Sequence, residues 1–229
     1  FVSMSELHER VGQRIAALIG VEAATVTTGA AGAITMGTAA CVTQGDPQKA
    51  RQLPNTRGMR NEVIVQKSHL SYKPQIHLVG ATIVEIETPE QLEAAIGPKT
   101  AMLFFVNTRD PKGQINREAW VAAGKRHGVP TLNDAAADIP PPHRLSEYVH
   151  MGFDLVAFSG GKGLLGPQCT GLLLGRKDLV EAARAHGSVW GGIGRGMKIG
   201  KEEVVGLLAA VERFMKLNHD SERQSLESR

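Results

Sequence analysis

Residues able to carry chemistry follow several apolar runs of the sequence, each run predicting a strand. Small residues 29–31 follow the first run, His69 follows a second, and Asp134 follows another. Ser159 and Lys162 come directly after a further run. Because ligands of open α/β sheets bind beyond the carboxyl ends of the strands, these residues are the first candidates for a shared site.

These residue types match what pyridoxal phosphate requires of a protein. A lysine amine such as that of Lys162 forms a Schiff base with the cofactor and later moves protons, while an aspartate such as Asp134 keeps the pyridine nitrogen protonated. Phosphate is bound well by backbone N–H groups at the start of a helix, where Gly29, Ala30 and Ala31 let the backbone come close. We therefore predict a pyridoxal-phosphate site.

Each of these residues alone has an ordinary structural interpretation. A lysine between glycines is usually a solvated loop residue, and an aspartate after a strand usually caps a helix or forms a turn. A lone histidine is usually structural, and a turn of small residues can serve only close helix–strand packing. Their joint placement at one edge of a sheet favours the cofactor site over these alternatives.

The elements expected around these residues alternate between strands and helices. Leu7, Val11, Ile15 and Leu18 recur at helical spacing up to Gly20, which predicts an amphipathic first helix. Further helices are expected from the turn at 28–33 to about 42 and at 89–96, 117–127 and 201–217. Strands are expected at 23–27, 62–66, 82–86, 100–106, 130–133, 154–158 and 170–174.

This order predicts a three-layer α/β fold, a mostly parallel sheet with helices on both faces. Residues 45–60 are interpreted as an irregular loop. The strand at 170–174 follows its predecessor so closely that we expect it to be antiparallel or at the edge of the sheet. Residues 1–218 would form one large domain, followed by a polar tail at 219–229.

Composition narrows the classes of function. The formal net charge of the 229 residues is +3, from 26 basic and 23 acidic residues, and only the stretch 176–201 is mildly basic. Nucleic-acid binding usually needs a denser basic patch. The apolar runs are far shorter than the roughly 20 residues that span a bilayer, so we expect a cytoplasmic protein.

Other motifs are weak or missing. Cys41 and Cys169 belong to no CxxC or Cys/His cluster, so we expect no disulfide framework and no metal site, and both cysteines are expected in the core. Residues 161–166 fit the pattern GxGxxG, but Pro167 and a strand follow instead of a helix. This argues against a Rossmann site, and the motifs for nucleotide and serine hydrolysis are missing from the sequence.

The stretch Phe-Ser-Gly-Gly-Lys-Gly-Leu-Leu-Gly-Pro-Gln at 158–168 resembles the cofactor-lysine motif of the family of bacterial selenocysteine synthases and D-glucosaminate-6-phosphate ammonia-lyases. The resemblance continues through 170–177, includes 80–86 and the turn at 28–33, and covers most of the chain. It implies the large domain of a fold-type I pyridoxal-phosphate transferase, close to class V aminotransferases. It also implies that the amino-terminal segment and most of the small carboxy-terminal domain are missing.

Carried over by position, the resemblance implies a role for each candidate. Lys162 forms the Schiff base, Asp134 contacts the pyridine nitrogen, and Ser159 joins residues 29–31 in holding the phosphate. His69 falls where class V enzymes stack a histidine on the cofactor ring. Many class V enzymes have a glutamine three residues after the aspartate, whereas this chain has Ala137.

The predicted function is a lyase or transferase reaction on a small amino acid or amino sugar acid, by removal of the α-proton and β-elimination. Arg195 and Lys198, just after a glycine-rich stretch, are candidates for binding the substrate. Selenium transfer onto seryl-tRNA is the first alternative, and a catalytically silent binding subunit is the second. We expect a homodimer or higher homo-oligomer, and the modest charge argues against tRNA as a partner.

Overall fold

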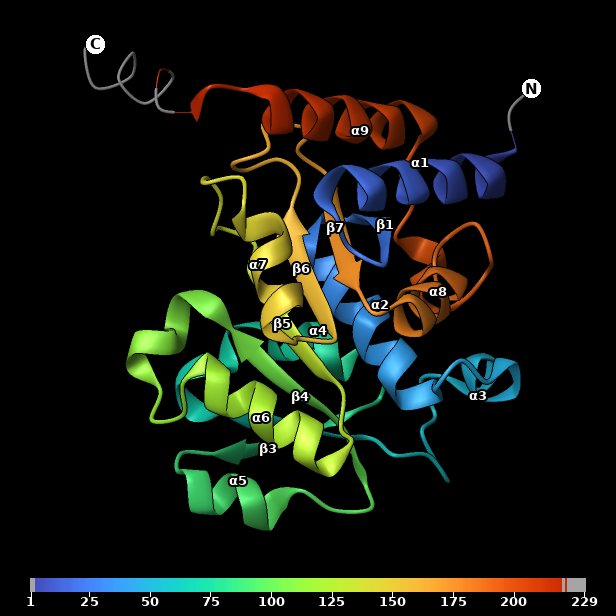
Figure 1. Cartoon of the computed structure of the whole chain (residues 1–229). Helices are drawn as coiled ribbons and strands as arrows, with labels where there is room; N and C mark the ends of the chain where they lie inside the picture. Colours follow the sequence, from blue (N-terminus) through green and yellow to red (C-terminus); the bar gives the residue numbers. More distant parts are fainter. Residues whose placement is uncertain (1–2, 220, 222–229) are drawn as a thin grey trace.

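A computed structural model describes residues 3–219 and 221 of the chain. The predicted polar tail at 219–229 therefore lies largely outside the described residues. Within them, one sheet is packed between two layers of helices, as Figure 1 shows. The predicted three-layer α/β architecture is confirmed.

The sheet has seven strands among the described residues, in the order β1-β7-β6-β5-β4-β2-β3. Strand β7 is antiparallel to both of its neighbours, β1 and β6, and the remaining pairs are parallel. The predicted antiparallel strand is confirmed, but it lies between two other strands and is not one of the two outer strands of the sheet. The strands are β1 Ala23–Thr28, β2 Glu62–Gln66, β3 Thr82–Ile86, β4 Thr100–Val106, β5 Thr131–Asp134, β6 Leu155–Ser159 and β7 Thr170–Gly175.

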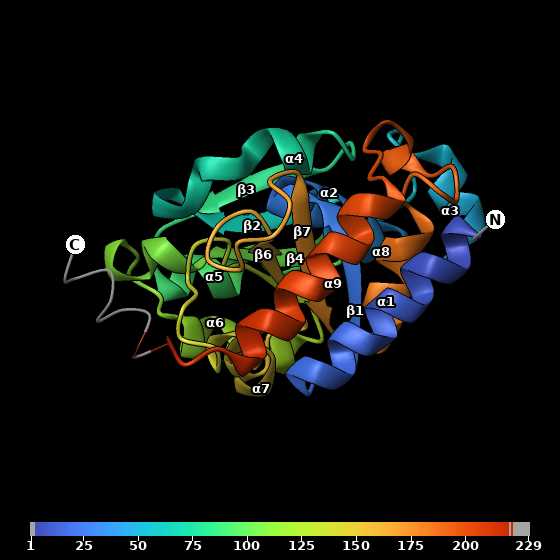
Figure 2. The ribbon, with the colours of Figure 1, turned by 90° about the horizontal axis from the view of Figure 1, so that it is seen from above.

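Two hydrophobic clusters, one on each face of the sheet, hold the layers together. Helices α1, α5, α6, α7 and α9 contribute to the first, and α2, α4 and α8 to the second. Figure 2 shows α1 and α9 side by side. The helices are α1 Met4–Ile19, α2 Gly29–Thr43, α3 Pro47–Gln52, α4 Lys73–His77, α5 Pro89–Ala95, α6 Arg117–His127, α7 Arg144–Met151, α8 Lys177–Ala185 and α9 Lys201–Lys216, with 3₁₀ turns η1 Lys67–Tyr72, η2 Asn107–Lys112 and η3 Ile193–Gly196.

Local signals explain the ends of α1. The hydroxyl of Ser3 accepts a hydrogen bond from the amide of Glu6, and Gly20 follows the last turn with φ of 80°. Glycine takes this left-handed conformation without steric cost, so a helix commonly ends there. The predicted amphipathic helix is confirmed, since Val11 and Ile15 are buried in the first cluster.

The structure corrects two expectations. The segment 45–60 contains the short helix α3, whose cap Asp46 accepts hydrogen bonds from the amides of Gln48 and Lys49. Cys41 is buried as expected, but Cys169 is exposed, because it lies in the turn before β7 and not within a strand.

Two kinds of feature are absent from the described part of the chain. None of the helices there is both long enough and apolar enough to cross a membrane. The same residues contain no group of three or more His, Cys, Asp or Glu side chains able to hold a metal ion.

Candidate active site

Strand register brings the predicted site residues to one edge of the sheet. Asp134 at the end of β5 lies opposite Val106 of β4 on one side and Ala157 of β6 on the other. Ser159 at the end of β6 lies opposite Gly171 of β7, and Gly171 also lies opposite Thr27 of β1. The start of α2, the end of β6 and the end of β5 therefore follow one another along this edge.

The first turn of α2 is open to an anion. Its preceding residue, Thr28, makes no capping hydrogen bond, so the first amides of the helix have no side-chain acceptor. Gly29 has φ of 66°, and a Cβ built on Gly171 would lie 2.3 Å from the carbonyl carbon of Gly29. Glycine at 171 thus lets the turn pack directly on β7. Unpaired helix amides favour a phosphate, and Ser159, 9% exposed, adds a hydroxyl at the end of β6.

Lys162 lies in a tight turn between β6 and β7. The amide of Gly160 donates to the carbonyl oxygen of Thr170, and the amide of Gly166 donates to that of Gly160, both at 2.8 Å. A Cβ on Gly163 would lie 2.1 Å from the carbonyl oxygen of Ile139, so a larger residue would force the turn apart. The side chain of Lys162 is exposed, and its amine is free to react.

Asp134 is a buried acid within reach of that positive charge. Its carboxylate is 4% exposed and accepts a hydrogen bond from the amide of Ala136 at 3.1 Å. Burial raises the pKa of Asp134 to about 6, although the Ala136 amide and the charge of Lys162 act in the opposite direction. A buried carboxylate of this kind is stabilised by a cationic partner, such as a protonated pyridine nitrogen.

His69 departs from its expected arrangement. Its ring is fully buried, its Nδ1 accepts a hydrogen bond from the amide of Val106 at 3.1 Å, and its centroid lies 4.5 Å from that of Phe105 in an edge contact. Burial lowers the pKa of His69 to about 4. The ring has no surface open to a ligand in this conformation, so stacking on a cofactor stays a prediction, and the observed contact ties η1 to β4.

A buried polar network next to Asp134 was not predicted from the sequence. The side-chain amide of Asn107 donates to Asp138 and to the hydroxyl of Tyr148, the latter at 2.9 Å, and accepts from Asn133. Burial raises the pKa of Asp138, and it raises that of Tyr148 to about 12. The network fixes the start of η2 against β5 and α7. The sequence signals are Asn107, which directly follows the apolar run 100–106, and a second acid four residues after Asp134.

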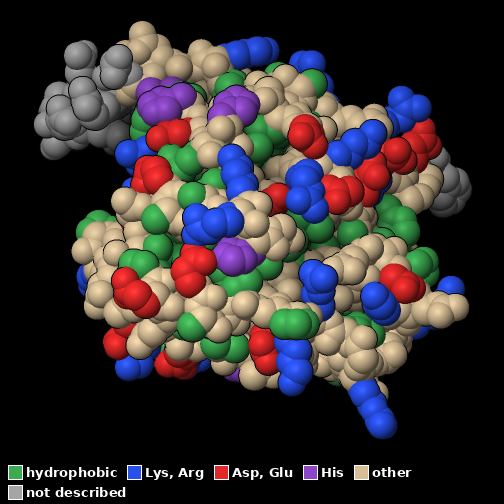
Figure 3. All heavy atoms as spheres, turned by 60° about the horizontal axis from the view of Figure 1, so that its bottom comes forward, with side chains coloured by type: hydrophobic (Ala, Val, Ile, Leu, Met, Phe, Trp, Pro, Cys, Tyr) green, Lys and Arg blue, Asp and Glu red, His purple; other side chains and the backbone are tan. Residues whose placement is uncertain are grey.

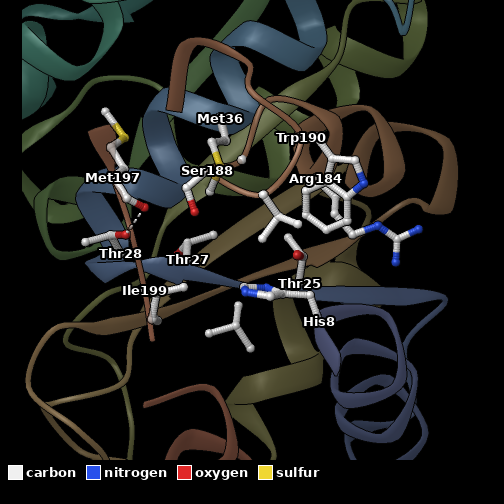
Figure 4. Close-up of a pocket in the computed structure, with 13 residues that line it drawn as sticks. His8, Thr25, Thr27, Thr28, Met36, Arg184, Ser188, Trp190, Met197 and Ile199 are labelled. Atoms are coloured by element: carbon white, nitrogen blue, oxygen red, sulfur yellow. Dashed lines mark hydrogen bonds between the residues drawn. The ribbon is translucent and has the colours of Figure 1, made fainter. Parts of the chain in front are cut away.

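The two candidate residues for binding the substrate, Arg195 and Lys198, lie near the start of α2. Thr28 donates its hydroxyl hydrogen to the carbonyl oxygen of Met197 at 2.7 Å, a bond visible in Figure 4 beside a pocket that His8 also lines. Lys198 follows Met197 and is exposed, as is Arg195 on η3. The structure thus places Lys198 close to the start of α2, and Arg195 lies on η3, which packs against α2.

A lysine turn, a buried acid and an uncapped helix start thus lie together at one end of the sheet. The chain belongs to the class V aminotransferase family: the model described as aminotransferase class-V matches residues 3–193. Its fold is that of fold-type I pyridoxal-phosphate enzymes. A solved structure of D-glucosaminate-6-phosphate ammonia-lyase superimposes with a TM-score of 0.87 at 33% identity, covering 95% of this chain and 60% of that one.

Curated relatives extend the comparison. The chain is 37% identical over 228 residues to 5'-C-glycyluridine monooxygenase-decarboxylase of Streptomyces sp. and 34% identical over 226 residues to D-glucosaminate-6-phosphate ammonia lyase of Salmonella typhimurium. Each match covers 93% of this chain but only 55% and 59% of the relatives. An L-seryl-tRNA(Sec) selenium transferase of Moorella thermoacetica is 31% identical over 154 residues, covering 59% of this chain and 32% of that protein. The predicted resemblance is confirmed.

Proposed function

We propose that this chain is the cofactor-binding part of a pyridoxal-phosphate enzyme that removes the α-proton of a small amino acid or amino sugar acid and eliminates its β-substituent. The observation that carries the proposal is the convergence of three features on one edge of the sheet. These are the exposed Lys162, the buried Asp134 and the uncapped first turn of α2. The relatives named as ammonia lyases support the same class of reaction.

Each residue would contribute one element of the chemistry. The amides of residues 29–31 and the Ser159 hydroxyl would hold the phosphate, and the Asp134 carboxylate would keep a proton on the pyridine nitrogen. When bound, the cofactor withdraws electrons from the α-carbon of the substrate. The amine of Lys162, once displaced by the substrate amine, would take the α-proton.

The atoms of the overall reaction balance without any external oxidant. The Cα–H bond and the bond from Cβ to its leaving group break, and the proton can pass to that group as it departs. The enamine released then tautomerises to an imine, and water adds to give a 2-keto acid and ammonia. Lys162 thus serves first to hold the cofactor and then to carry the proton.

Surface charge favours a small substrate over tRNA, the partner that selenium transfer would require. On the face seen in Figure 3, Lys and Arg side chains alternate with Asp and Glu and form no continuous basic patch. A silent binding subunit is disfavoured because the chain retains both Lys162 and Asp134. A homo-oligomeric state and a cytoplasmic location stay predictions.

Borohydride labelling of the full-length protein tests the proposal. We expect a visible absorbance with pyridoxal phosphate and, after reduction, a pyridoxyl group on the peptide that contains Lys162. Lys162→Ala should lose the covalent label and keep weaker, phosphate-driven binding, whereas Lys177→Ala on the exposed face of α8 should behave as the wild type. Labelling of another lysine would refute the assignment.

A substrate screen separates the candidate reactions. Release of ammonia and a keto acid from D-glucosaminate 6-phosphate, 5'-C-glycyluridine and serine should identify the substrate class. Binding of seryl-tRNA should be weak at micromolar protein. Tight tRNA binding that falls by about 10³–10⁵ between 50 and 200 mM salt, as expected for roughly 6–10 phosphate contacts, would make selenium transfer the leading function.

A further inference from the structure

Arg109 lies on the part of the site formed by η1 and η2, where His69 is the one residue assigned so far. It belongs to η2, which follows β4 directly, and the last residue of β4, Val106, pairs with Asp134. Along the edge, the start of α2 comes first, then Lys162 after β6, then Asp134, and then η2. Arg109 is therefore on the far side of Asp134 from the phosphate-binding turn.

The guanidinium of Arg109 has no ion pair or hydrogen bond to any side chain of residues 3–219 and 221, although Arg109 as a residue is partly buried. The neighbouring Asp110 is not its ion-pair partner, because the Asp110 carboxylate pairs with Arg117 at 2.7 Å. Arginine stays charged at every physiological pH, and withdrawing a charge from water without a partner is unfavourable. A partly buried, unpaired guanidinium at a ligand-binding edge is therefore arranged for an anion that comes with the ligand.

Tyr72 links Arg109 to the rest of the site. This partly buried phenol is at the end of η1, which packs on η2. Its pKa is raised chiefly by the negative charge of Asp134 and then by burial, while the positive charge of Arg109 acts in the opposite direction. Tyr72 is thus close to both charged groups, which places Arg109 and Asp134 around the same space.

The covalent structure of pyridoxal phosphate indicates which part of a bound substrate would lie near Arg109. The reacting carbon, C4', is attached to the ring between C5, which carries the phosphate arm, and C3, which carries a hydroxyl. If the start of α2 takes the phosphate and Asp134 takes the ring nitrogen, residues beyond Asp134 lie on the C3 side. A substrate amine bound at C4' that turned its carboxylate away from the phosphate arm would direct it towards that side.

We propose that Arg109 binds the α-carboxylate of the amine substrate and thereby selects amino acids over simple amines. This inference rests on the proposed function and identifies a residue of the same site. A carboxylate matches one guanidinium better than a phosphate does, because two parallel N–H groups meet its two oxygens and a single positive charge neutralises it. Among the described residues, one other guanidinium is placed beside η2 by an ion pair, that of Arg117, and it is already neutralised by Asp110.

Two oxyamine probes test the assignment on the full-length protein loaded with pyridoxal phosphate. Aminooxyacetate carries a carboxylate and O-methylhydroxylamine does not, yet both displace the lysine amine and form an oxime that changes the cofactor absorbance. The half-saturating concentration of each probe is read from this absorbance and does not depend on turnover. The comparison isolates the carboxylate, since the reacting N–O group is the same.

In Arg109→Gln we expect the half-saturating concentration of aminooxyacetate to rise about 10- to 100-fold, the range for a lost charge-assisted pair. That of O-methylhydroxylamine should change less than about twofold. Arg109→Lys keeps the charge and loses the paired N–H groups. Its half-saturating concentration of aminooxyacetate should lie between those of the wild type and Arg109→Gln. Arg126→Gln is the matched control, because Arg126 pairs with Glu93 near the carboxyl end of α6, at the opposite edge of the sheet.

The outcomes separate the two proposals. Equal changes for both probes, or unchanged binding of aminooxyacetate, would overturn the role of Arg109 while leaving the cofactor site intact. If Arg109→Gln does not fold, the test uses Arg109→Lys. An unchanged preference of that variant for aminooxyacetate would also overturn the role of Arg109. Absence of any absorbance change in the wild-type protein would overturn the proposed function, and this inference with it.

Discussion

The two sides of the candidate site are built in different ways. The phosphate side, formed by the start of α2, Ser159 and the Lys162 turn, consists largely of backbone amides, small residues and glycines. The substrate side, formed by η1 and η2, consists of larger side chains, among them His69, Tyr72 and Arg109. The first side is shaped by short-range backbone geometry, whereas the second depends on contacts between segments far apart in the sequence.

Cofactor binding and substrate selectivity therefore depend on different parts of the site. A Cβ at Gly171 or Gly163 would meet backbone atoms at 2.3 Å and 2.1 Å, so the phosphate side tolerates little variation. On the substrate side Tyr72 and Arg109 are only partly buried, so their side chains can be exchanged with less displacement of the backbone. Relatives with this fold can therefore keep one cofactor site and vary the group that meets the substrate.

Asp134 lies between the two sides, and its replacement should have the largest effect. In Asp134→Asn we expect the cofactor to stay bound while the rate of α-proton removal falls by roughly 10²–10⁴, the usual contribution of a positioned acid or base. A neutral partner no longer favours the protonated ring. The rate is measured as exchange of the α-proton with deuterated water.

The ordinary structural role of Asp134 makes a different prediction. If the carboxylate served only to accept the Ala136 amide, asparagine would replace it almost equally well. The variant would then lose about 1 kcal/mol of stability at most and keep wild-type exchange.

Two buried titratable groups of the site, Asp134 and His69, have pKa shifts of opposite direction. Burial raises the pKa of Asp134 from 3.8 to about 6 and lowers that of His69 from 6.5 to about 4. The stabilising contribution of Asp134 is complete below pH 3.8 and is lost as the pH rises through about 6. That of His69 is complete above pH 6.5 and is lost as the pH falls through about 4. Each shift corresponds to about 3 kcal/mol in the free energy of unfolding.

In the cofactor-free protein these two contributions should nearly cancel between about pH 4 and pH 6. Asp134→Asn should become less stable, relative to the wild type, as the pH is lowered across this range. His69→Asn, whose side-chain oxygen can still accept from the Val106 amide, should become less stable as the pH is raised. Urea unfolding of the three proteins at several pH values measures the profiles, and parallel profiles would contradict the assigned shifts.

The same contrast explains what could be predicted from the sequence. All seven strands were predicted to within about one residue at each end, because buried strands are continuous apolar runs. The start of α2, Ser159 and Lys162 were also expected to lie together, as they do in the structure, since their signals are local glycine and small-residue patterns. Their binding of phosphate stays a prediction. Helices α3, α4, α7 and α8 were missed. Each is short, and α7 follows a run of prolines at 140–142 that is typical of a loop.

The substrate side could not be predicted in the same way. His69 was singled out by residue type, but its partner Val106 lies 37 positions away, and nothing in the local sequence identifies that amide. Tyr72 and Arg109 are ordinary loop residues in the sequence. Their proximity to Asp134 arises only when η1 and η2 pack together at the ends of β2 and β4.

The smallest expected effect concerns the support behind η2. Tyr148 is buried in α7, and its hydroxyl accepts a hydrogen bond from the side-chain amide of Asn107 at 2.9 Å. In Tyr148→Phe this bond and the hydrogen bond between the Tyr148 hydroxyl and Asp138 are lost, while the bond from Asn107 to Asp138 remains. We expect the free energy of unfolding to fall by about 1–2 kcal/mol, the net value of one or two buried hydrogen bonds, as measured by urea titration.

Tyr72→Phe is the matched control for Tyr148→Phe, since these are the two tyrosines of the chain. The Tyr72 hydroxyl makes no hydrogen bond within residues 3–219 and 221, so its removal should change stability by less than about 0.5 kcal/mol. Because the Asn107 network holds η2 and not the phosphate side, Tyr148→Phe should weaken aminooxyacetate binding slightly and leave cofactor affinity unchanged. Weaker cofactor binding in Tyr148→Phe would instead mean that the two sides of the site are coupled through β5, where Asp134 and Asn133 are adjacent.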